Sequence, residues 1–132
     1  MTTTPPAEAV RALRLFTGLA QRDMARRLNM ERRSYQRIES GADPCPPGVL
    51  REVEAMADEF ARDVELILDL AERRAPDEGP LPLEVVADGT PAEEWARLVA
   101  GRAFVETTED HPIALSMATS TGNTAPEERS TA

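Results

Sequence analysis

The sequence has no lysine, a single cysteine and a single histidine. Because Cys45 has no second cysteine to pair with, the chain cannot form an internal disulfide, which fits the reducing environment of the cytoplasm. A zinc site that used Cys45 and His111 would also need acidic ligands, and none is suitably spaced. We therefore expect a cytoplasmic protein without a metal or any other cofactor.

Long hydrophobic runs are also missing. No stretch approaches the roughly 18 apolar residues that span a bilayer, and residues 1–9 lack the basic and apolar parts of a signal peptide. The chain has no nucleophile–base pair, phosphate-binding loop or metal cluster, which are the usual signs of an active site. The sequence thus predicts a protein that is not an enzyme and has no membrane partner.

Charge is abundant and unevenly distributed. The 15 arginines and 24 acidic residues give a net charge of −9. Residues 8–41 hold eight arginines and four acids, a net charge of +4, whereas residues 42–132 hold seven arginines and twenty acids, a net charge of −13. A basic segment ahead of an acidic one creates the positive field that a phosphate backbone would meet.

The basic segment has the hydrophobic spacing of three short helices. Apolar residues recur every three positions from Val10 to Phe16, and Gly18 ends this first helix. A second helix is predicted over about residues 20–28 and a third over about residues 31–40. Short helices at this spacing must pack against one another, because none of them buries enough apolar surface alone.

The third of these helices is unusually polar. Only Tyr35 and Ile38 are apolar, and they mark its buried side. Asn29, which tolerates the left-handed conformation, precedes the helix in a tight turn, and Gly41 ends it. The opposite side presents a face of arginine and glutamine, made of Arg32, Arg33, Gln36 and Arg37.

A long helix is predicted next, over about residues 49–74. Its apolar residues recur at spacings of three and four, the heptad-like stripe of Val53, Ala57, Phe60, Val64, Ile67 and Ala71. A helix of this length exceeds what the three short helices can cover. The stripe either packs against other parts of its own chain or contributes to a dimer interface.

The remaining residues are less regular. Residues 81–86 have the composition of a short strand, and Thr90 with Glu93 forms a capping box that opens a helix carrying Trp95. Residues 106–132 are rich in threonine, serine and acids apart from a small apolar patch, and we expect most of them to be disordered.

The stretch from Leu13 to Gly41 resembles the Cro/CI-type (XRE) helix-turn-helix family. The matching positions are Leu13-Arg14, Gly18-Leu19, Gln21, Met24-Ala25, Leu28, Met30, Tyr35, Ile38-Glu39 and Gly41. The spacing is unbroken, and Ala25 is small where the second and third helices must cross closely. The resemblance implies a DNA-binding transcriptional regulator whose third helix lies in the major groove.

The resemblance also implies roles for individual residues. Gln21 begins the second helix and is placed to hold a DNA phosphate. Arginine pairs bidentately with guanine and glutamine with adenine, so Arg33 and Gln36 are the leading base readers. Arg32 and Arg37 either read bases or hold phosphate. The expected base-reading set is Arg32, Arg33, Gln36 and Arg37, and the expected phosphate set is Arg14, Gln21, Arg22, Arg26 and Ser34.

Two alternatives stay open within this segment. The arginines of the third helix could form an ordinary solvated face, although the motif favours DNA contact. Glu31 could cap the third helix or accept a hydrogen bond from a cytosine amino group, and we favour capping.

A closer resemblance links residues 33–41, with the proline and long helix that follow, to the regulators of anti-CRISPR operons and their bacterial relatives. The tryptophan-bearing helix around residues 94–98 is similar to one in those proteins. This resemblance implies a homodimer formed by the C-terminal part, which represses its own operon in a phage or a bacterium.

We therefore expect a mainly α fold. Its four parts are a Cro/CI-type helix-turn-helix head, a long connecting helix, a small helical or α+β dimerisation segment and a disordered tail, over residues 5–46, 47–75, 81–105 and 106–132. The expected partners are double-stranded DNA and a second copy of the chain. The alternative function is a protein-interaction module, such as an antitoxin, whose acidic C-terminal tail binds a partner protein.

Overall fold

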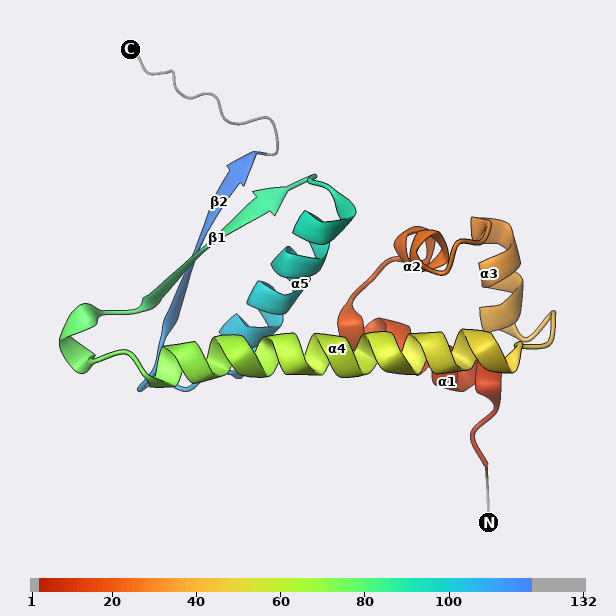
Figure 1. Cartoon of the computed structure of the whole chain (residues 1–132), viewed down its shortest axis with the longest axis horizontal. Coiled ribbons are helices and arrows are strands. Elements are labelled where there is room, and N and C mark those ends of the chain that lie inside the picture. Colours follow the sequence, from red (N-terminus) through yellow and green to blue (C-terminus); the bar gives the residue numbers. More distant parts are fainter. Residues whose placement is uncertain (1–2, 120–132) are drawn as a thin grey trace. The chain divides into compact units, whose positions relative to one another are not determined.

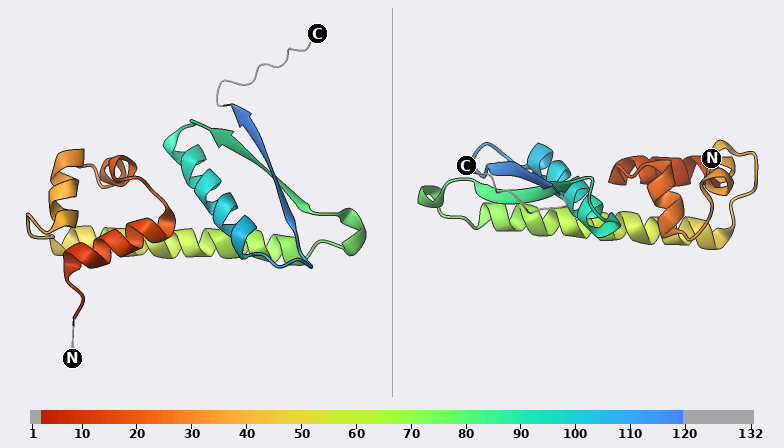
Figure 2. Two further views of the ribbon diagram at one scale, coloured as in Figure 1. Left: turned by 180° about the vertical axis from the view of Figure 1, so that it is seen from behind. Right: turned by 90° about the horizontal axis from the view of Figure 1, so that it is seen from above.

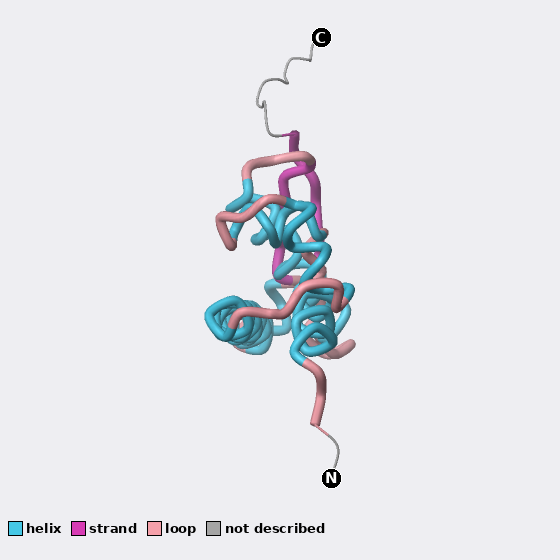
Figure 3. The backbone as a smooth tube through the Cα atoms, turned by 90° about the vertical axis from the view of Figure 1, so that its right-hand side faces the viewer, coloured by secondary structure: helices cyan, strands magenta, loops and turns pink. Residues whose placement is uncertain are grey.

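The computed structural model describes residues 3–119, which form five α-helices, one short 3-10 helix and two strands (Figure 1). The chain divides into two compact units, Met1–Ala61 and Arg62–Ala132, and the helix α4 contributes to both. Within the described residues, all strand structure belongs to the second unit (Figure 3). None of the helices of residues 3–119 is long and apolar enough to cross a membrane.

The first unit contains the three short helices expected from the sequence. They are α1 (Pro6–Thr17), α2 (Gln21–Arg27) and α3 (Arg32–Ser40), and the long helix α4 (Pro47–Glu72) follows.

The turns between these helices also confirm the predictions. Gly18 and Gly41 end α1 and α3 with φ of 84° and 85°, a conformation that glycine adopts without strain. Asn29 has φ of 58° in the turn between α2 and α3, as expected of a residue that tolerates the left-handed region.

A small hydrophobic core holds the first unit together. Val10, Met24 and Tyr35 are fully buried, one from each short helix. The ring of Phe60 from α4 meets the ring of Phe16 edge to face, with centroids 5.5 Å apart and planes at 77°. Each large side chain buried in this way stabilises the fold by about 1.5–3 kcal/mol, so these few residues suffice to fix the three short helices.

The apolar stripe of α4 is buried within its own chain. This is the first of the two alternatives considered for it, the other being a dimer interface. Its residues Val53, Ala57, Phe60, Val64 and Ala71 are buried, and Ile67 is half-buried. Two leucines of the same helix point elsewhere: Leu66 and Leu70 remain 62% and 51% exposed. The apolar surface that α4 leaves uncovered is therefore formed by these leucines rather than by the stripe.

The second unit is a β–α–β arrangement. After the 3-10 helix (Pro76–Glu78), β1 (Leu81–Ala87) pairs in parallel with β2 (Ile113–Thr119), and α5 (Pro91–Glu106) connects them. The register runs from Leu81 opposite Ile113 to Ala87 opposite Thr119. The strands lie side by side, and α5 packs along them (Figure 2).

The capping box predicted for α5 is present. Thr90 Oγ1 accepts a hydrogen bond from the backbone N–H of Glu93 at 3.2 Å, and Glu93 Oε1 accepts one from the backbone N–H of Thr90 at 2.8 Å. Trp95 is buried, and its Nε1 donates to Asp63 Oδ2 of α4 at 2.8 Å. Trp95 is thus an anchor of the core of this unit.

The strand β2 corrects the prediction of a disordered tail over residues 106–132. Residues 113–119 form a strand, and α5 continues to Glu106. The apolar residues Ile113, Leu115 and Met117 alternate with smaller ones, and this short alternation gains a hydrogen-bonding partner only when β1 lies beside it. The rest of the predicted tail, residues 120–132, lies outside the described residues.

Candidate nucleic-acid interface

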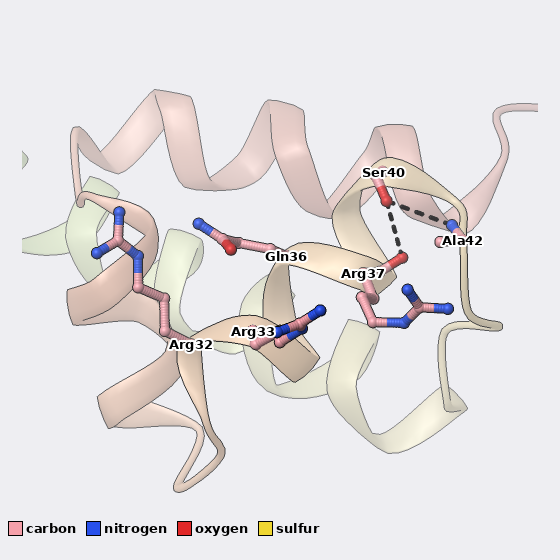
Figure 4. Close-up of a pocket in the computed structure, with 6 residues that line it drawn as sticks. All are labelled: Arg32, Arg33, Gln36, Arg37, Ser40 and Ala42. Carbon is pink, nitrogen blue, oxygen red and sulfur yellow. Dashed lines mark hydrogen bonds between the residues drawn. The ribbon is translucent and has the colours of Figure 1, made fainter.

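The helix α3 has one buried side and one uncovered side. Tyr35, Ile38 and Glu39 are buried against the rest of the first unit, whereas Arg32, Arg33 and Ser34 are exposed. The uncovered side lines an open hollow together with the turn that follows the helix (Figure 4), and the residues around this hollow are Arg32, Arg33, Gln36, Arg37, Ser40 and Ala42. The structure therefore brings the four expected base readers together on one surface.

The arginines of this surface differ in their surroundings. Within residues 3–119, neither Arg32 nor Arg33 forms an ion pair. Arg37 is held by Asp43, with Nε to Oδ2 at 3.0 Å and Nη2 to Oδ1 at 3.1 Å. Arg32 and Arg33 thus present their guanidinium groups to an outside acceptor, while part of the Arg37 guanidinium is already engaged.

A chain of amides connects this surface to the interior. Gln36 Nε2 donates to Gln21 Oε1 at 3.1 Å, and Gln21 Nε2 donates to Glu39 Oε1 at 3.0 Å. Gln21 is the first residue of α2 and is half-buried. Its amide oxygen accepts from Gln36 and its amide nitrogen donates to Glu39, so the hydrogen bonds of Gln21 orient the side chain of Gln36.

The buried carboxylate of Glu39 organises this network. Its side chain is 3% exposed and accepts hydrogen bonds from Arg14 Nε and Nη2, both at 2.8 Å, from Gln21 and from the hydroxyl of Tyr35. Burial would raise the pKa of Glu39, but the hydrogen bonds from Arg14, Tyr35 and Gln21 outweigh it and hold the pKa at about 2. Burial and the bond to Glu39 raise the pKa of Tyr35.

The surroundings of Arg14 speak against its expected role as a phosphate contact. Its side chain is only 12% exposed, two of its nitrogens donate to Glu39, and Nη1 donates to the carbonyl oxygen of Leu19 at 2.9 Å. Arg14 is therefore the cation that neutralises a buried acid.

The sequence held a signal for this pair. Glu39 lies four residues after Tyr35, so it falls on the buried side of α3, and a charge buried there requires a partner of opposite sign. The identity of that partner, 25 positions earlier in the chain, depends on how α1 packs against α3.

The expected phosphate contacts on α2 are exposed. The side chains of Arg22 and Arg26 are 66% and 53% exposed, and both lie near Asp23 at 3.6 and 3.3 Å. Because the two guanidinium groups are mostly in water, their attraction to Asp23 is screened and they stay available to an anion. Ser34 is exposed in the first turn of α3.

Glu31 occupies the N-cap position of α3 but does not cap it with its side chain. Its backbone is extended, with φ of −69° and ψ of 146°, and its side chain makes no cap hydrogen bond. The favoured prediction for Glu31 is therefore wrong. Glutamate is longer than the Ser, Thr, Asp and Asn side chains that reach the first backbone N–H groups easily.

Comparison with known proteins agrees with this geometry. Residues 7–70 match the family model of a helix-turn-helix domain. No curated protein and no solved structure matches the chain. The matched region begins in α1, ends in α4, and excludes β1, α5 and β2. The chain therefore carries a helix-turn-helix domain, a fold in which the second helix of the motif enters the major groove of DNA.

Proposed function

We propose that the protein is a sequence-specific DNA-binding transcriptional regulator that places α3 in the major groove. The observation that carries this proposal is the uncovered face of α3, where Arg32, Arg33, Gln36 and Arg37 gather around one hollow. The other side of the same helix is locked by the buried carboxylate of Glu39. Rigid presentation of side chains that match guanine and adenine is what direct readout of bases requires.

The geometry supports different roles for the exposed residues, some reading bases and others contacting phosphates. Arg33 and Gln36 suit base reading, because Arg33 has no acidic partner within residues 3–119 and Gln36 donates to Gln21. Arg22, Arg26 and Ser34 suit contacts with the phosphate backbone, which position the protein without reading sequence. The proposal leaves Arg14 out of the phosphate contacts because Glu39 occupies its guanidinium.

The proposal includes a homodimer that represses its own gene. A single small head contacts one half-site, and two copies together would read a pseudo-palindromic operator with half-sites about one helical turn apart. The second unit supports this, because it carries nearly all of the large apolar side chains that the described residues leave exposed: Leu66, Leu70, Phe104, Val105, Leu115 and Met117. The concentration of these exposed apolar side chains in one unit favours an interface there.

The open edge of β2 is the part of this surface best suited to a second copy. Edge strands of single-chain proteins usually carry charges or prolines that prevent pairing with another strand. Residues 113–119 contain neither, although residues 62–119 hold thirteen acids and five arginines. A second β2 related by two-fold symmetry would pair with it antiparallel and bring no like charge to the contact.

In this proposal the protein has no catalytic activity of its own and acts in the cytoplasm, where bacterial DNA lies. Nothing in residues 3–119 favours the alternative of an antitoxin whose acidic tail binds a partner.

A gel shift with the DNA upstream of the gene tests the proposal. Wild type is compared at two salt concentrations with the double variant Arg33→Ala/Gln36→Ala and with Arg73→Ala, which removes an exposed arginine outside the first unit. We expect a specific shift that weakens with salt, disappears in the double variant and persists in Arg73→Ala. Equal binding by wild type and the double variant would show that α3 is not the reading helix.

A further inference from the structure

The ion pair between Arg37 and Asp43 has an unusually directed geometry for a surface contact. Both carboxylate oxygens take part, with Nε to Oδ2 at 3.0 Å and Nη2 to Oδ1 at 3.1 Å. The two side chains are 51% and 44% exposed, so the pair adds little to stability. A bidentate contact does, however, fix the plane and direction of the guanidinium group.

The turn after α3 holds Asp43 in place. The backbone N–H of Asp43 donates to the carbonyl oxygen of Arg37 at 3.0 Å, which closes the helix end. Ser40 Oγ donates to the same carbonyl at 3.1 Å and accepts from the N–H of Ala42 at 3.3 Å (Figure 4). Gly41 supplies the left-handed backbone that this turn needs. The acid is therefore positioned before any DNA arrives.

The contact leaves one edge of the guanidinium free for a base. Arginine has five N–H groups, and Asp43 takes the one on Nε and one of the two on Nη2. The remaining N–H groups of Nη1 and Nη2 form the parallel pair that matches O6 and N7 of guanine. Arg37 lines the same hollow as Arg33 and Gln36.

We propose that Asp43 is a specificity-determining residue, which holds Arg37 in the orientation that reads a guanine. This inference rests on the proposed function. The negative charge of Asp43 would weaken attraction between Arg37 and a phosphate, so the pair is poorly suited to backbone contact. A guanine, which offers two acceptors in fixed geometry, still benefits from an arginine whose direction is set in advance.

Selection of binding sites from a random pool of double-stranded DNA tests this role. The full-length wild type is compared with Asp43→Ala, with the isosteric Asp43→Asn and with Arg37→Lys, which keeps the charge but cannot form the parallel pair. We expect all three variants to lose preference for guanine at the same one position, on the order of tenfold for Asp43→Ala. Preference at the other positions, and the melting temperature, should stay close to wild type.

Asp23→Ala is the matched control, because it also removes an acid that lies beside exposed arginines of the first unit. It should alter affinity for all sequences alike and leave every base preference intact. If Asp43→Ala behaves in the same way while wild type selects a clear site, Asp43 acts only through its charge and the inference is overturned. If Arg37→Lys retains every base preference, the inference is likewise wrong. Absence of any selected site with wild type would instead overturn the proposed function, and this inference with it.

Discussion

At the scale of single residues, Glu39 connects the core of the first unit to its exposed face. Its buried carboxylate binds Arg14 and Tyr35 on the inside, and Gln21 carries the connection to Gln36 in the hollow. A buried ion pair adds little net stability over an apolar pair, but removal of one partner leaves the other charge buried and uncompensated. The position of Gln36 thus depends on a residue that DNA would not touch.

We expect Glu39→Gln to destabilise the protein by about 3–5 kcal/mol, because it leaves the guanidinium of Arg14 without its counter-charge. The free energy of unfolding from urea titrations measures this effect. Glu106→Gln is the control, since Glu106 pairs with Arg102 in an exposed contact within α5 at 3.1 Å. The control should change stability by no more than about 0.5 kcal/mol. Equal effects of the two substitutions would show that the Glu39 network is not structurally important.

The lowered pKa of Glu39 predicts that the free energy of unfolding decreases as the pH falls. The pKa of Glu39 is about 2 in the folded protein and about 4.5 for an ordinary glutamate, so its contribution to stability is fully present above pH 4.5. That contribution is lost as the pH falls from 4.5 towards 2, because the carboxylate must then bind a proton. The gap in unfolding free energy between wild type and Glu39→Gln should therefore narrow over this range. If the difference in unfolding free energy between wild type and Glu39→Gln stays constant between pH 6 and pH 3, the pKa of Glu39 is not lowered.

At the scale of elements, the end of α3 depends on the backbone of Gly41. A Cβ added there would meet no atom within 4 Å, so substitution is opposed by the φ of 85° rather than by crowding. Gly48 also has open space around its Cβ direction, but it lies inside α4 and has no positive φ. A substitution at Gly41 therefore meets backbone strain without crowding, whereas the same substitution at Gly48 meets neither.

We expect Gly41→Ala to destabilise the protein by about 1–2 kcal/mol, the cost of a left-handed alanine. Gly48→Ala should be neutral or stabilising by up to about 1 kcal/mol, because alanine narrows the unfolded ensemble and favours helix. Thermal unfolding of the two variants measures both effects. A lower melting temperature for Gly48→Ala than for Gly41→Ala would show that the turn after α3 is not held in the left-handed form.

At the scale of the whole molecule, a helix-turn-helix domain is combined with a second unit whose apolar residues are only partly covered. Leu83 and Val85 of β1 lie opposite Leu115 and Met117 of β2 in the register. Leu115 and Met117 remain 38% and 62% exposed. Two parallel strands with one connecting helix bury less apolar surface than parallel sheets usually do, and this is the physical reason to expect assembly.

Met117→Glu should convert a dimer into a monomer, because each two-fold contact would acquire a pair of uncompensated charges. Sedimentation equilibrium over a range of protein concentrations measures the change. Ala55→Glu is the control, since it adds the same charge at an exposed position of α4 in the first unit, outside β2. A wild-type protein that stays monomeric at all concentrations would contradict the homodimer, and a dimer retained in Met117→Glu would place the interface elsewhere.

The sequence alone determined the helices of the first unit and the face of α3. Spacings of three and four residues, the glycines at 18 and 41 and the asparagine at 29 encode these features locally, and the structure confirms them. Local spacing also predicted α4, its apolar stripe and the capping box of α5, but not whether the stripe is covered by its own chain.

Only the tertiary structure decided which distant residues meet. Arg14 and Glu39 are 25 positions apart, and β2 pairs with a strand that precedes α5. Residues 113–119 are too short and too rich in small side chains to predict a strand without their partner. Even Arg37 and Asp43, only six positions apart, meet because the turn after α3 folds back on itself. Such contacts depend on the path of the chain in space, which spacing along the sequence does not record.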